Sequence, residues 1–415
     1  MPLKNGPRLE DSPGELDKTF ATAGQIEIEQ RGTANAITSD SEARLLLALQ
    51  ENNGFVLSRY GVDGEKDGDF KETHWNFEDG DVSTPTRVLL QEDNKIVLIG
   101  RSLKNGIERA AVTRFNSNGS PDLVFGRRVL PVPDNTVTPR LNYKFVDGCL
   151  KHGNKILVCA CHKSGPLEVP LSRVYCLMGN GEPDETFGSD GGFINIMLHD
   201  QPSYVTDVQI QHDGKIIVAG SWTYSGKSKR TRTVARYTPT GVLDNTFGRA
   251  GYADIVVPDE SSPKAKALDF ADLVNRLVIQ SDDKILIAGY SPAADGRESG
   301  LLARLNVDGT VDADFHAGTP LLVSRPLNDL TLNALALQPD GKIVAVGRSL
   351  VAGTVMQCYE RISETGELEN FWKGNSIGDC SDVTIQPSGR VVIAGSSGAS
   401  FTGARYPRVW GRVGN

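Results

Sequence analysis

Apolar residues along the chain follow the two-residue period of β-strands, and no segment of useful length has a helical period. The stretch 205–220 reads VTDVQIQHDGKIIVAG: polar and apolar residues alternate first, and an almost unbroken apolar run follows an Asp-Gly pair. Alternation is typical of a strand with two unlike faces, whereas the apolar run is typical of a strand buried on both faces. Because Asp-Gly favours a tight turn, this stretch predicts a β-hairpin.

The same hairpin recurs along the chain, and in all but the last copy it is followed by a third strand, a glycine turn and a segment of the Leu-Asp-x-x-Phe type that leads to a fourth strand. Good copies of the second half are TVARYTPTGVLDNTFG at 233–248 and LLARLNVDGTVDADF at 301–315. Seven copies, 48 to 69 residues apart, are marked by the residue that opens the second strand: Arg44, Lys95, Lys155, Lys215, Lys284, Lys342 and Arg390. Four antiparallel strands in each of seven copies predict an all-β, seven-bladed β-propeller.

The two ends of the chain favour a ring over a solenoid of the same repeats. Residues 14–30 match the Leu-Asp-x-x-Phe segment and a fourth strand but have no hairpin before them, and the seventh hairpin lacks that segment. A ring is closed by this arrangement and loses its exposed sheet edges, whereas a solenoid gains nothing from it. We therefore expect a tail at 1–13 and a single propeller at 14–415, with 14–30 as the outermost strand of the last blade. Which strand of each blade is innermost stays open at this point.

The repeated pattern, QPDGKI and then ARLNxDGxxDxxFG, resembles the delta-60 repeat, an uncharacterised β-propeller repeat of many bacterial proteins. The resemblance covers nearly the whole chain, and the fourth, fifth and sixth copies carry it best. The first copy lacks the Asp-Gly turn, and the third has Ala160 in place of the glycine that ends the second strand. The resemblance implies the propeller fold and no particular chemistry.

The repeated residues have structural explanations of their own. We expect the aromatic residue of each Leu-Asp-x-x-Phe segment to fill the wedge between neighbouring blades: Phe20, Phe70, Phe125, Phe187, Phe247, Phe315 and, in the sixth copy, Trp372. We expect the aspartate to accept backbone N–H groups in the turn: Asp17, Asp122, Asp184, Asp244 and Asp312.

Composition agrees with a turn-rich propeller and argues against two classes of function, nucleic-acid binding and membrane insertion. Glycine makes up 44 of the 415 residues, which fits the many turns, and a net charge of −8 argues against a nucleic-acid binder. No apolar run is long enough to insert into a membrane, and MPLKNGPRLEDSPGEL at the N-terminus has no apolar core of a signal peptide. We expect a monomeric scaffold in the cytoplasm, with leaderless export as the alternative. The six cysteines are expected to be free and buried.

No motif for catalysis or for a bound group is present. The chain lacks a Gly-x-Ser-x-Gly elbow, a phosphate loop and a dinucleotide fingerprint, and its six histidines show no paired spacing. The acidic run 63–69 has a composition that suits Ca²⁺, but Lys66 interrupts it and the aligned copies are ordinary glycine turns. The sequence therefore predicts no metal and no cofactor.

Variation between copies collects on one face. The loops between second and third strands and the crossovers between blades differ in every copy: 102–109, 162–172, 222–233, 291–300, 396–407, 131–142 and 258–271. Binding residues are commonly carried on such loops. One loop combines aromatic and basic residues that could hold an anionic sugar, a phosphate or an acidic protein segment: Trp222, Tyr224, Lys227, Lys229, Arg230 and Arg232. The alternative is a solvated hairpin tip.

These observations predict a non-catalytic binding protein that presents variable loops on a rigid propeller to a protein or carbohydrate partner. The alternative is a hydrolase or lyase with its active site in the central funnel of the same face. That alternative rests on fold analogy alone.

Overall fold

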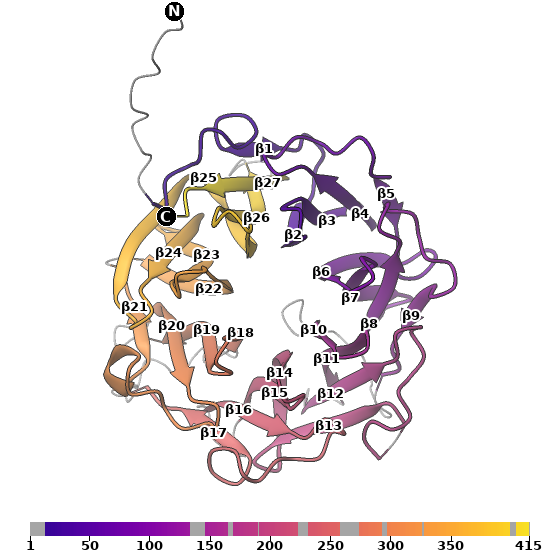
Figure 1. Cartoon of the computed structure of the whole chain (residues 1–415), viewed down its shortest axis with the longest axis vertical. Helices are drawn as coiled ribbons and strands as arrows, with labels where there is room; N and C mark the ends of the chain where they lie inside the picture. The colour runs from indigo at the N-terminus through magenta and orange to yellow at the C-terminus, as the bar shows by residue number, and fades with distance from the viewer. Residues whose placement is uncertain are drawn as a thin grey trace, which may run out of the picture.

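The chain is all-β in the computed structural model, which describes residues 13–132, 146–164, 169–189, 191–222, 231–257, 274–292, 297–325, 328–398 and 404–414. Within these ranges it has 27 strands, no α-helix and one short 3₁₀ turn at His316–Gly318. Figure 1 shows the strands standing around a central axis, which the chain circles in sequence order. The architecture is that of a β-propeller.

Three of the five sheets contain four antiparallel strands in sequence order. The first consists of β2 (Thr33–Ser39), β3 (Leu45–Glu51), β4 (Gly54–Tyr60) and β5 (Thr73–Trp75). The second consists of β6 (Val82–Leu90), β7 (Ile96–Lys104), β8 (Ile107–Phe115) and β9 (Arg127–Val129). The third consists of β18 (Val274–Ile279), β19 (Ile285–Pro292), β20 (Glu298–Leu305) and β21 (Leu321–Val323).

The other two sheets are larger because neighbouring groups of strands join at their edges. The eight-stranded sheet consists of β10 (Val146–Lys151), β11 (Lys155–Ser164), β12 (Val169–Leu177), β13 (Phe193–Leu198), β14 (Gln201–Ile210), β15 (Ile216–Trp222), β16 (Thr231–Tyr237) and β17 (Tyr252–Ile255). Its halves meet through only two residue pairs between β13 and β14. The seven-stranded sheet consists of β22 (Asn328–Leu337), β23 (Ile343–Val351), β24 (Thr354–Ile362), β25 (Leu368–Ile385), β26 (Val391–Gly398), β27 (Arg405–Arg412) and β1 (Gln25–Glu27). The 18-residue β25 pairs with β24 and β26 along different parts of its length.

The strand nearest the axis, which the sequence leaves open, is the first strand of each hairpin (Figure 1). These first strands are β2, β6, β10, β14, β18, β22 and the last part of β25. The second strands, nearly continuous in apolar residues, are buried along most of their length in several hydrophobic clusters. This innermost position places several of their polar residues, such as Asn35 and Thr86, beside the axis.

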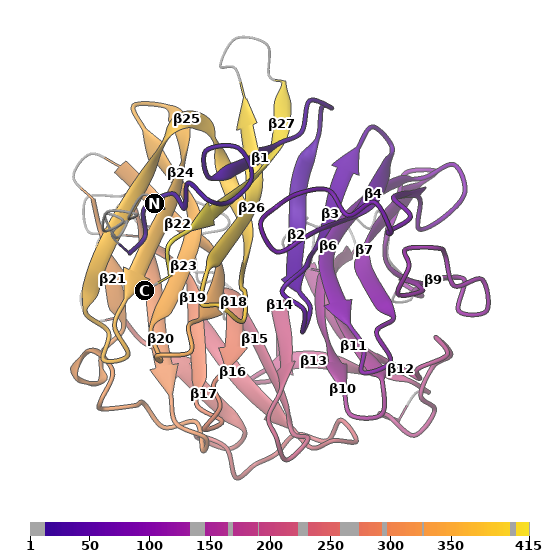
Figure 2. The same cartoon turned by 45° about the horizontal axis from the view of Figure 1, so that its top comes forward.

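β1 lies beside β27, the last strand of the chain (Figure 2). β1 pairs antiparallel with β27 in the register Gln25↔Trp410, Ile26↔Val409 and Glu27↔Arg408, and it is the edge strand of its sheet. Upstream of β1, Asp17 forms an ion pair with Arg390 at 2.6 Å. The N-terminal segment thus lies at the edge of the sheet that contains the last hairpin.

The aromatic side chains of the Leu-Asp-x-x-Phe segments pack against the following copy of the repeat. Each lies beneath a glycine of the next turn: Phe20 beneath Gly64, Phe70 beneath Gly119, Phe125 beneath Gly181, Phe187 beneath Gly241, Phe247 beneath Gly309 and Phe315 beneath Gly366. These glycines have φ of +84° to +90°, and an added Cβ would lie 2.7–3.2 Å from the aromatic ring. Backbone conformation and close packing therefore both require glycine. The sixth copy differs: Trp372 lies within β25 beneath Arg412, and Tyr359 packs against Gly14 instead.

The repeated aspartates accept backbone N–H groups, which confirms the expectation for the turns. Asp244, for example, accepts the N–H of Thr246 at 3.1 Å and pairs with Arg236 at 2.8 Å. Burial alone would raise the pKa of Asp244, but these interactions and the hydroxyl of Thr246 outweigh it and lower the pKa to about 2. Asp122, beside Lys95 and Arg114, and Asp184, beside Lys155 and Thr186, also have a pKa of about 2. The residues that recur in every copy thus have structural roles, so function must be sought among residues that differ.

Candidate functional site

A cavity of about 380 Å³ lies on the axis and is lined mainly by the first strands. Six of these strands carry a β-bulge at the same place, at Asn35, Thr86, Thr206, Asn275, Asn333 and Ser381. A bulge redirects side chains, and all of these residues except Thr206 line the cavity. The repeat therefore produces a polar ring around the axis even though its individual residues vary.

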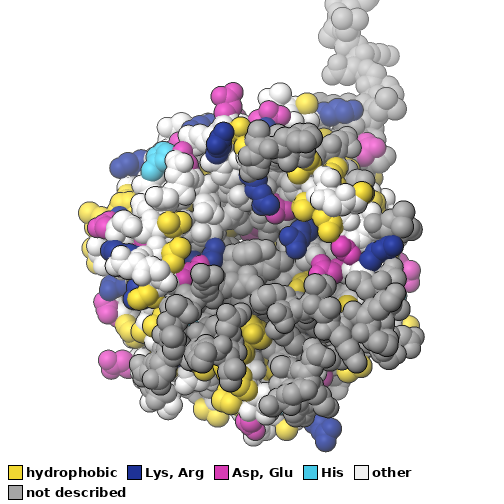
Figure 3. All heavy atoms as spheres, turned by 180° about the vertical axis from the view of Figure 1, so that it is seen from behind, with side chains coloured by type: hydrophobic (Ala, Val, Ile, Leu, Met, Phe, Trp, Pro, Cys, Tyr) yellow, Lys and Arg dark blue, Asp and Glu magenta, His cyan; other side chains and the backbone are white. Residues whose placement is uncertain are grey.

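The cavity lies toward the face that carries the turns between second and third strands. Gln50, Arg101 and Arg348 line it from the second strands β3, β7 and β23, and each stands near the end that leads into such a turn. This is the face that the variable loops single out in the sequence. Figure 3 shows it from outside, with basic and acidic side chains close together around its middle.

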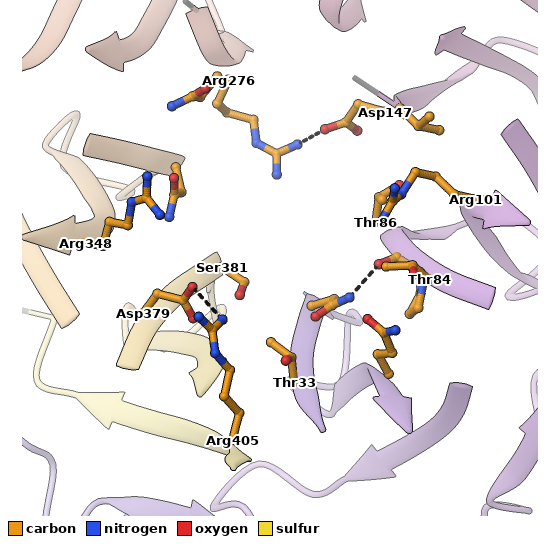
Figure 4. A pocket seen from close by; sticks show the side chains of 16 residues that line it. Thr33, Thr84, Thr86, Arg101, Asp147, Arg276, Arg348, Asp379, Ser381 and Arg405 are labelled. Carbon is orange, nitrogen blue, oxygen red and sulfur yellow. Dashed lines mark hydrogen bonds and ion pairs between the residues drawn. The ribbon is translucent and has the colours of Figure 1, made fainter. Parts of the chain in front are cut away.

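Guanidinium groups outnumber carboxylates in the lining. Four arginines, Arg101, Arg276, Arg348 and Arg405, face two aspartates, Asp147 and Asp379 (Figure 4). Arg276 pairs with Asp147, and Arg405 pairs with Asp379 at 3.4 Å. This local excess of positive charge contrasts with the net charge of −8 of the whole chain.

Arg348 differs from the other three arginines. Arg101 pairs with Glu108, which lies outside the lining, so three of the four guanidinium groups have a carboxylate partner. The half-buried side chain of Arg348 makes no hydrogen bond or ion pair with any residue that the structure describes. It is the guanidinium best placed to receive an anion from outside.

Apart from Thr86, which donates to the carbonyl of Ile99, the uncharged polar residues of the lining fall into two groups. Asn35, Asn275 and Asn333 donate from Nδ2 to backbone carbonyls of the next first strand, at 3.0, 2.7 and 2.9 Å, and so tie neighbouring sheets together. Four side chains, which we call the open polar set, make no side-chain hydrogen bond within the described ranges: Thr33, Gln50, Thr84 and Ser381. These four groups are free to bind a ligand.

Below the cavity, charged side chains close the channel. The axial charge ring consists of Arg87, Asp147, Asp207, Arg276 and Asp382, which occupy one repeat position on five first strands. Arg276 contacts Asp382 at 3.4 Å as well as Asp147, and Arg87 lies 3.5 Å from Asp147 and 3.9 Å from Asp382. Two of the carboxylates also bind the neighbouring strand: Asp207 accepts the N–H of Leu277 at 2.8 Å, and Asp382 that of Ile37 at 3.1 Å. These contacts cross the axis and form the floor of the cavity.

Asp207 makes the stability of the protein dependent on pH. Burial, and then the negative charge of Asp147, raise the pKa of Asp207 to about 7. A folded-state pKa above the unfolded value of about 3.9 means that this contribution to stability is complete below pH 4 and is lost as the pH rises through 7. Asp207→Asn should therefore gain stability relative to the native protein between pH 4 and pH 8, measured by urea unfolding.

The control for this measurement is Asp314→Asn, which changes an exposed carboxylate. Its difference in unfolding free energy from the native protein should be the same at both ends of the pH range. If Asp207→Asn also gave a constant difference, the raised pKa of Asp207 would be refuted.

The aromatic and basic loop of the sequence analysis is only partly described. Trp222 ends β15 and Arg232 lies in β16, and their side chains are 4% and 1% exposed. Trp222 donates from Nε1 to Thr233 Oγ1 at 2.9 Å and stacks on His199 at 4.7 Å, and Arg232 donates to the carbonyl of Tyr290 at 3.1 Å. These two side chains therefore pack within the fold and are not an exposed binding surface. Tyr224, Lys227, Lys229 and Arg230 lie outside the described residues.

Within the described part of the chain, the acidic run 63–69 and the cysteines form no candidate site. Of the acidic run 63–69, Asp67 pairs with Arg59 at 2.6 Å and Asp63 with Arg390 at 3.0 Å, and no group of three or more His, Cys, Asp or Glu is suited to a metal. All six cysteines are buried and form no disulfide, and burial raises the pKa of Cys176 to about 12. No described helix is long and apolar enough to cross a membrane.

Comparison with known proteins agrees with the fold. Residues 91–125, 211–247 and 280–315 match the family described as "Domain of unknown function (DUF5122) beta-propeller". No curated protein sequence matches the chain. The match supports a β-propeller repeat family.

Similar solved structures include three proteins with different names. A streptogramin B lyase has a TM-score of 0.53 and 10% identity, over 93% of this chain and 96% of the lyase. Domains 1–2 of Drosophila semaphorin 1b have a TM-score of 0.53 and 10% identity, over 96% and 88%. The polysaccharide lyase Uly1 has a TM-score of 0.52 and 11% identity, over 98% and 95%. At such low identity these likenesses concern the fold alone, so the chain is a β-propeller whose function has to be argued from its own residues.

Proposed function

We propose that the chain is a seven-bladed propeller closed by residues 14–30, and that it is a non-catalytic binding protein for an anionic group of a protein or carbohydrate partner. The pairing of β1 with β27 and the packing of Phe20 beneath Gly64 support closure. The seven first strands, arranged around one axis in Figure 1, support the blade count. The binding site is the cavity on the face of the variable loops.

The guanidinium of Arg348, which has no partner among the described residues, is the observation that carries this proposal. A half-buried cation gives up part of its hydration and gains most from a charge-assisted hydrogen bond to an anion. The surrounding arginines add to the positive potential, and a recess in a low-dielectric wall focuses it. An anionic ligand is therefore attracted to this cavity although the whole chain is acidic.

The lining favours binding over the enzyme alternative. A hydrolase or a lyase needs a group that takes up or supplies a proton. The described residues of the lining include no histidine, cysteine, lysine or tyrosine, and both aspartates are paired with arginine. The lyases among the similar structures add no weight to catalysis because they share only the fold.

Arg348→Ala should weaken the binding of anionic ligands about 10- to 100-fold, because it removes the one arginine of the described lining that has no partner among the described residues. The measurement is an array that carries acidic oligosaccharides, neutral oligosaccharides and acidic peptides, probed at physiological ionic strength. The native protein should bind acidic members of the array and leave neutral ones unbound.

Arg249→Ala is the matched control, because Arg249 is an exposed arginine in the turn after β16, outside the cavity lining. It removes the same charge and should leave binding unchanged. Equal binding by Arg348→Ala and by the native protein would contradict the proposal, as would equal binding of neutral and acidic oligosaccharides.

A further inference from the structure

We propose, on the basis of the binding function above, that the ligand is a hydroxylated carboxylate of the uronic acid type, with its carboxylate at Arg348 and its hydroxyl groups at the open polar set. Such a group can come from a free sugar acid or from the end of an acidic glycan. The two sources share the chemistry that the cavity recognises.

The charged end of the ligand is placed by two arginines on one side of the cavity. Figure 4 shows Arg348 and Arg405 on this side, with Arg405 directed toward Asp379. The pair between Arg405 and Asp379 is long, at 3.4 Å, and the side chain of Arg405 is 55% exposed, so this guanidinium also has capacity for a further acceptor. The planar fork of Arg348 matches the two oxygens of a carboxylate.

The remainder of the cavity is built for groups that both donate and accept hydrogen bonds. Thr33, Thr84 and Ser381 offer hydroxyl groups, and Gln50 offers an amide, all without a side-chain partner among the described residues. A ligand hydroxyl also both donates and accepts hydrogen bonds, so it can pair with each of these groups whether that group donates or accepts. Thr84 lies on the side of the cavity opposite Arg348 (Figure 4), so the hydroxylated part of the ligand extends away from its charged end.

The size of the cavity and the polarity of its lining favour a small polar ligand. A volume of about 380 Å³ is at the lower end of the range of about 300–1,000 Å³ for small-molecule sites. The described lining has only two apolar residues, Pro85 and Val146, so a ligand with hydrogen-bonding groups matches it better than an apolar ligand does. Because the Arg276–Asp147 pair lies at the floor, the ligand enters as a single residue or as a chain end and does not thread through.

Three small molecules test separately whether the cavity recognises the carboxylate and the hydroxyl groups. Methyl glucuronide carries both the carboxylate and the hydroxyl groups, cyclohexanecarboxylate carries only the carboxylate, and methyl glucoside carries only the hydroxyl groups. Titration calorimetry should show binding of methyl glucuronide, with each of the other two weaker by at least about tenfold. A site built around hydroxyl groups discriminates in this way because its polar groups are left unpaired by the analogue.

Two variants test the assigned contacts. Arg348→Ala should lower the affinity for methyl glucuronide to that for methyl glucoside. The double variant Thr33→Val/Thr84→Val removes two hydroxyl groups at nearly constant shape and should weaken methyl glucuronide about tenfold while leaving cyclohexanecarboxylate unchanged. General damage to the fold would weaken both ligands, and Arg249→Ala should alter neither.

The outcomes distinguish this inference from the binding function on which it rests. Tighter binding of a glucuronate-ended oligosaccharide than of the monosaccharide supports the inference and makes a glycan the source, whereas preference for the monosaccharide supports it with a free sugar acid. Equal affinity for cyclohexanecarboxylate overturns the inference but leaves anion binding intact. Binding of acidic peptides without binding of methyl glucuronide also overturns the inference and leaves anion binding intact. If no anion of any kind bound, both proposals would be wrong.

Discussion

A chain that begins at residue 29 should no longer unfold in one cooperative transition, because it lacks the segment that pairs with β27. The truncation exposes an edge of β27 that β1 covers, and exposed edges invite pairing between molecules. It also removes Phe20, which is fully buried, and loss of a buried phenylalanine costs about 3–5 kcal/mol. Two more anchors are lost: the Asp17–Arg390 ion pair at 2.6 Å and the hydrogen bond from Arg412 to the Gly14 carbonyl, also 2.6 Å. The sum is comparable with the whole stability of a typical domain, about 5–15 kcal/mol.

The matched control begins at residue 13 and keeps every described contact of the N-terminal segment. Scanning calorimetry should give this control the melting temperature of the full chain, and should give the chain that begins at residue 29 a broad transition at much lower temperature. An unchanged, cooperative melt of the shorter chain would show that residues 14–30 do not close the propeller.

The repeat made much of the fold predictable. Hairpins follow from the two-residue period, and turns follow from glycines that must adopt positive φ beneath a buried aromatic ring, as at Gly241 over Phe187. These constraints are local, so the residues that impose them recur from copy to copy. Which strand faces the axis is decided by how the sheets pack together, and a two-residue period alone carries no information about that choice.

The site was harder to predict because its residues differ between copies. Gln50, Arg101 and Arg348 occupy one repeat position, six residues after the start of the second strand, and all three line the cavity. Comparison of this position across the copies would have found them, whereas a search for clustered chemistry leads to the loop at 222–232. In sequence, an aromatic residue and a cation look alike at the buried base of a hairpin, where Trp222 and Arg232 lie, and at its exposed tip.

Arg276→Met should destabilise the protein by about 3–5 kcal/mol at pH 7, because it leaves the carboxylates of the axial charge ring without their main counter-charge. Burial alone would lower the pKa of Arg276, but the charges of Asp147 and Asp382 outweigh it and raise the pKa, so the guanidinium stays charged in the folded protein. Once it is removed, Arg87 alone faces Asp147, Asp207 and Asp382 at the centre of the ring. The loss should shrink as the pH falls, since protonation of the remaining carboxylates relieves their repulsion.

A second substitution tests whether charge or shape causes this loss. Arg276→Met/Asp147→Asn removes both members of the central pair and should recover a large part of the stability, since replacing a whole buried pair is far less harmful than breaking it. Arg249→Met makes the same substitution at an exposed position and should change the unfolding free energy by less than about 0.5 kcal/mol. If the double variant were no more stable than Arg276→Met in urea unfolding, shape would be the cause. The ring would then stabilise the protein through packing, and its ion pairs would not be the interaction that holds the first strands together beneath the cavity.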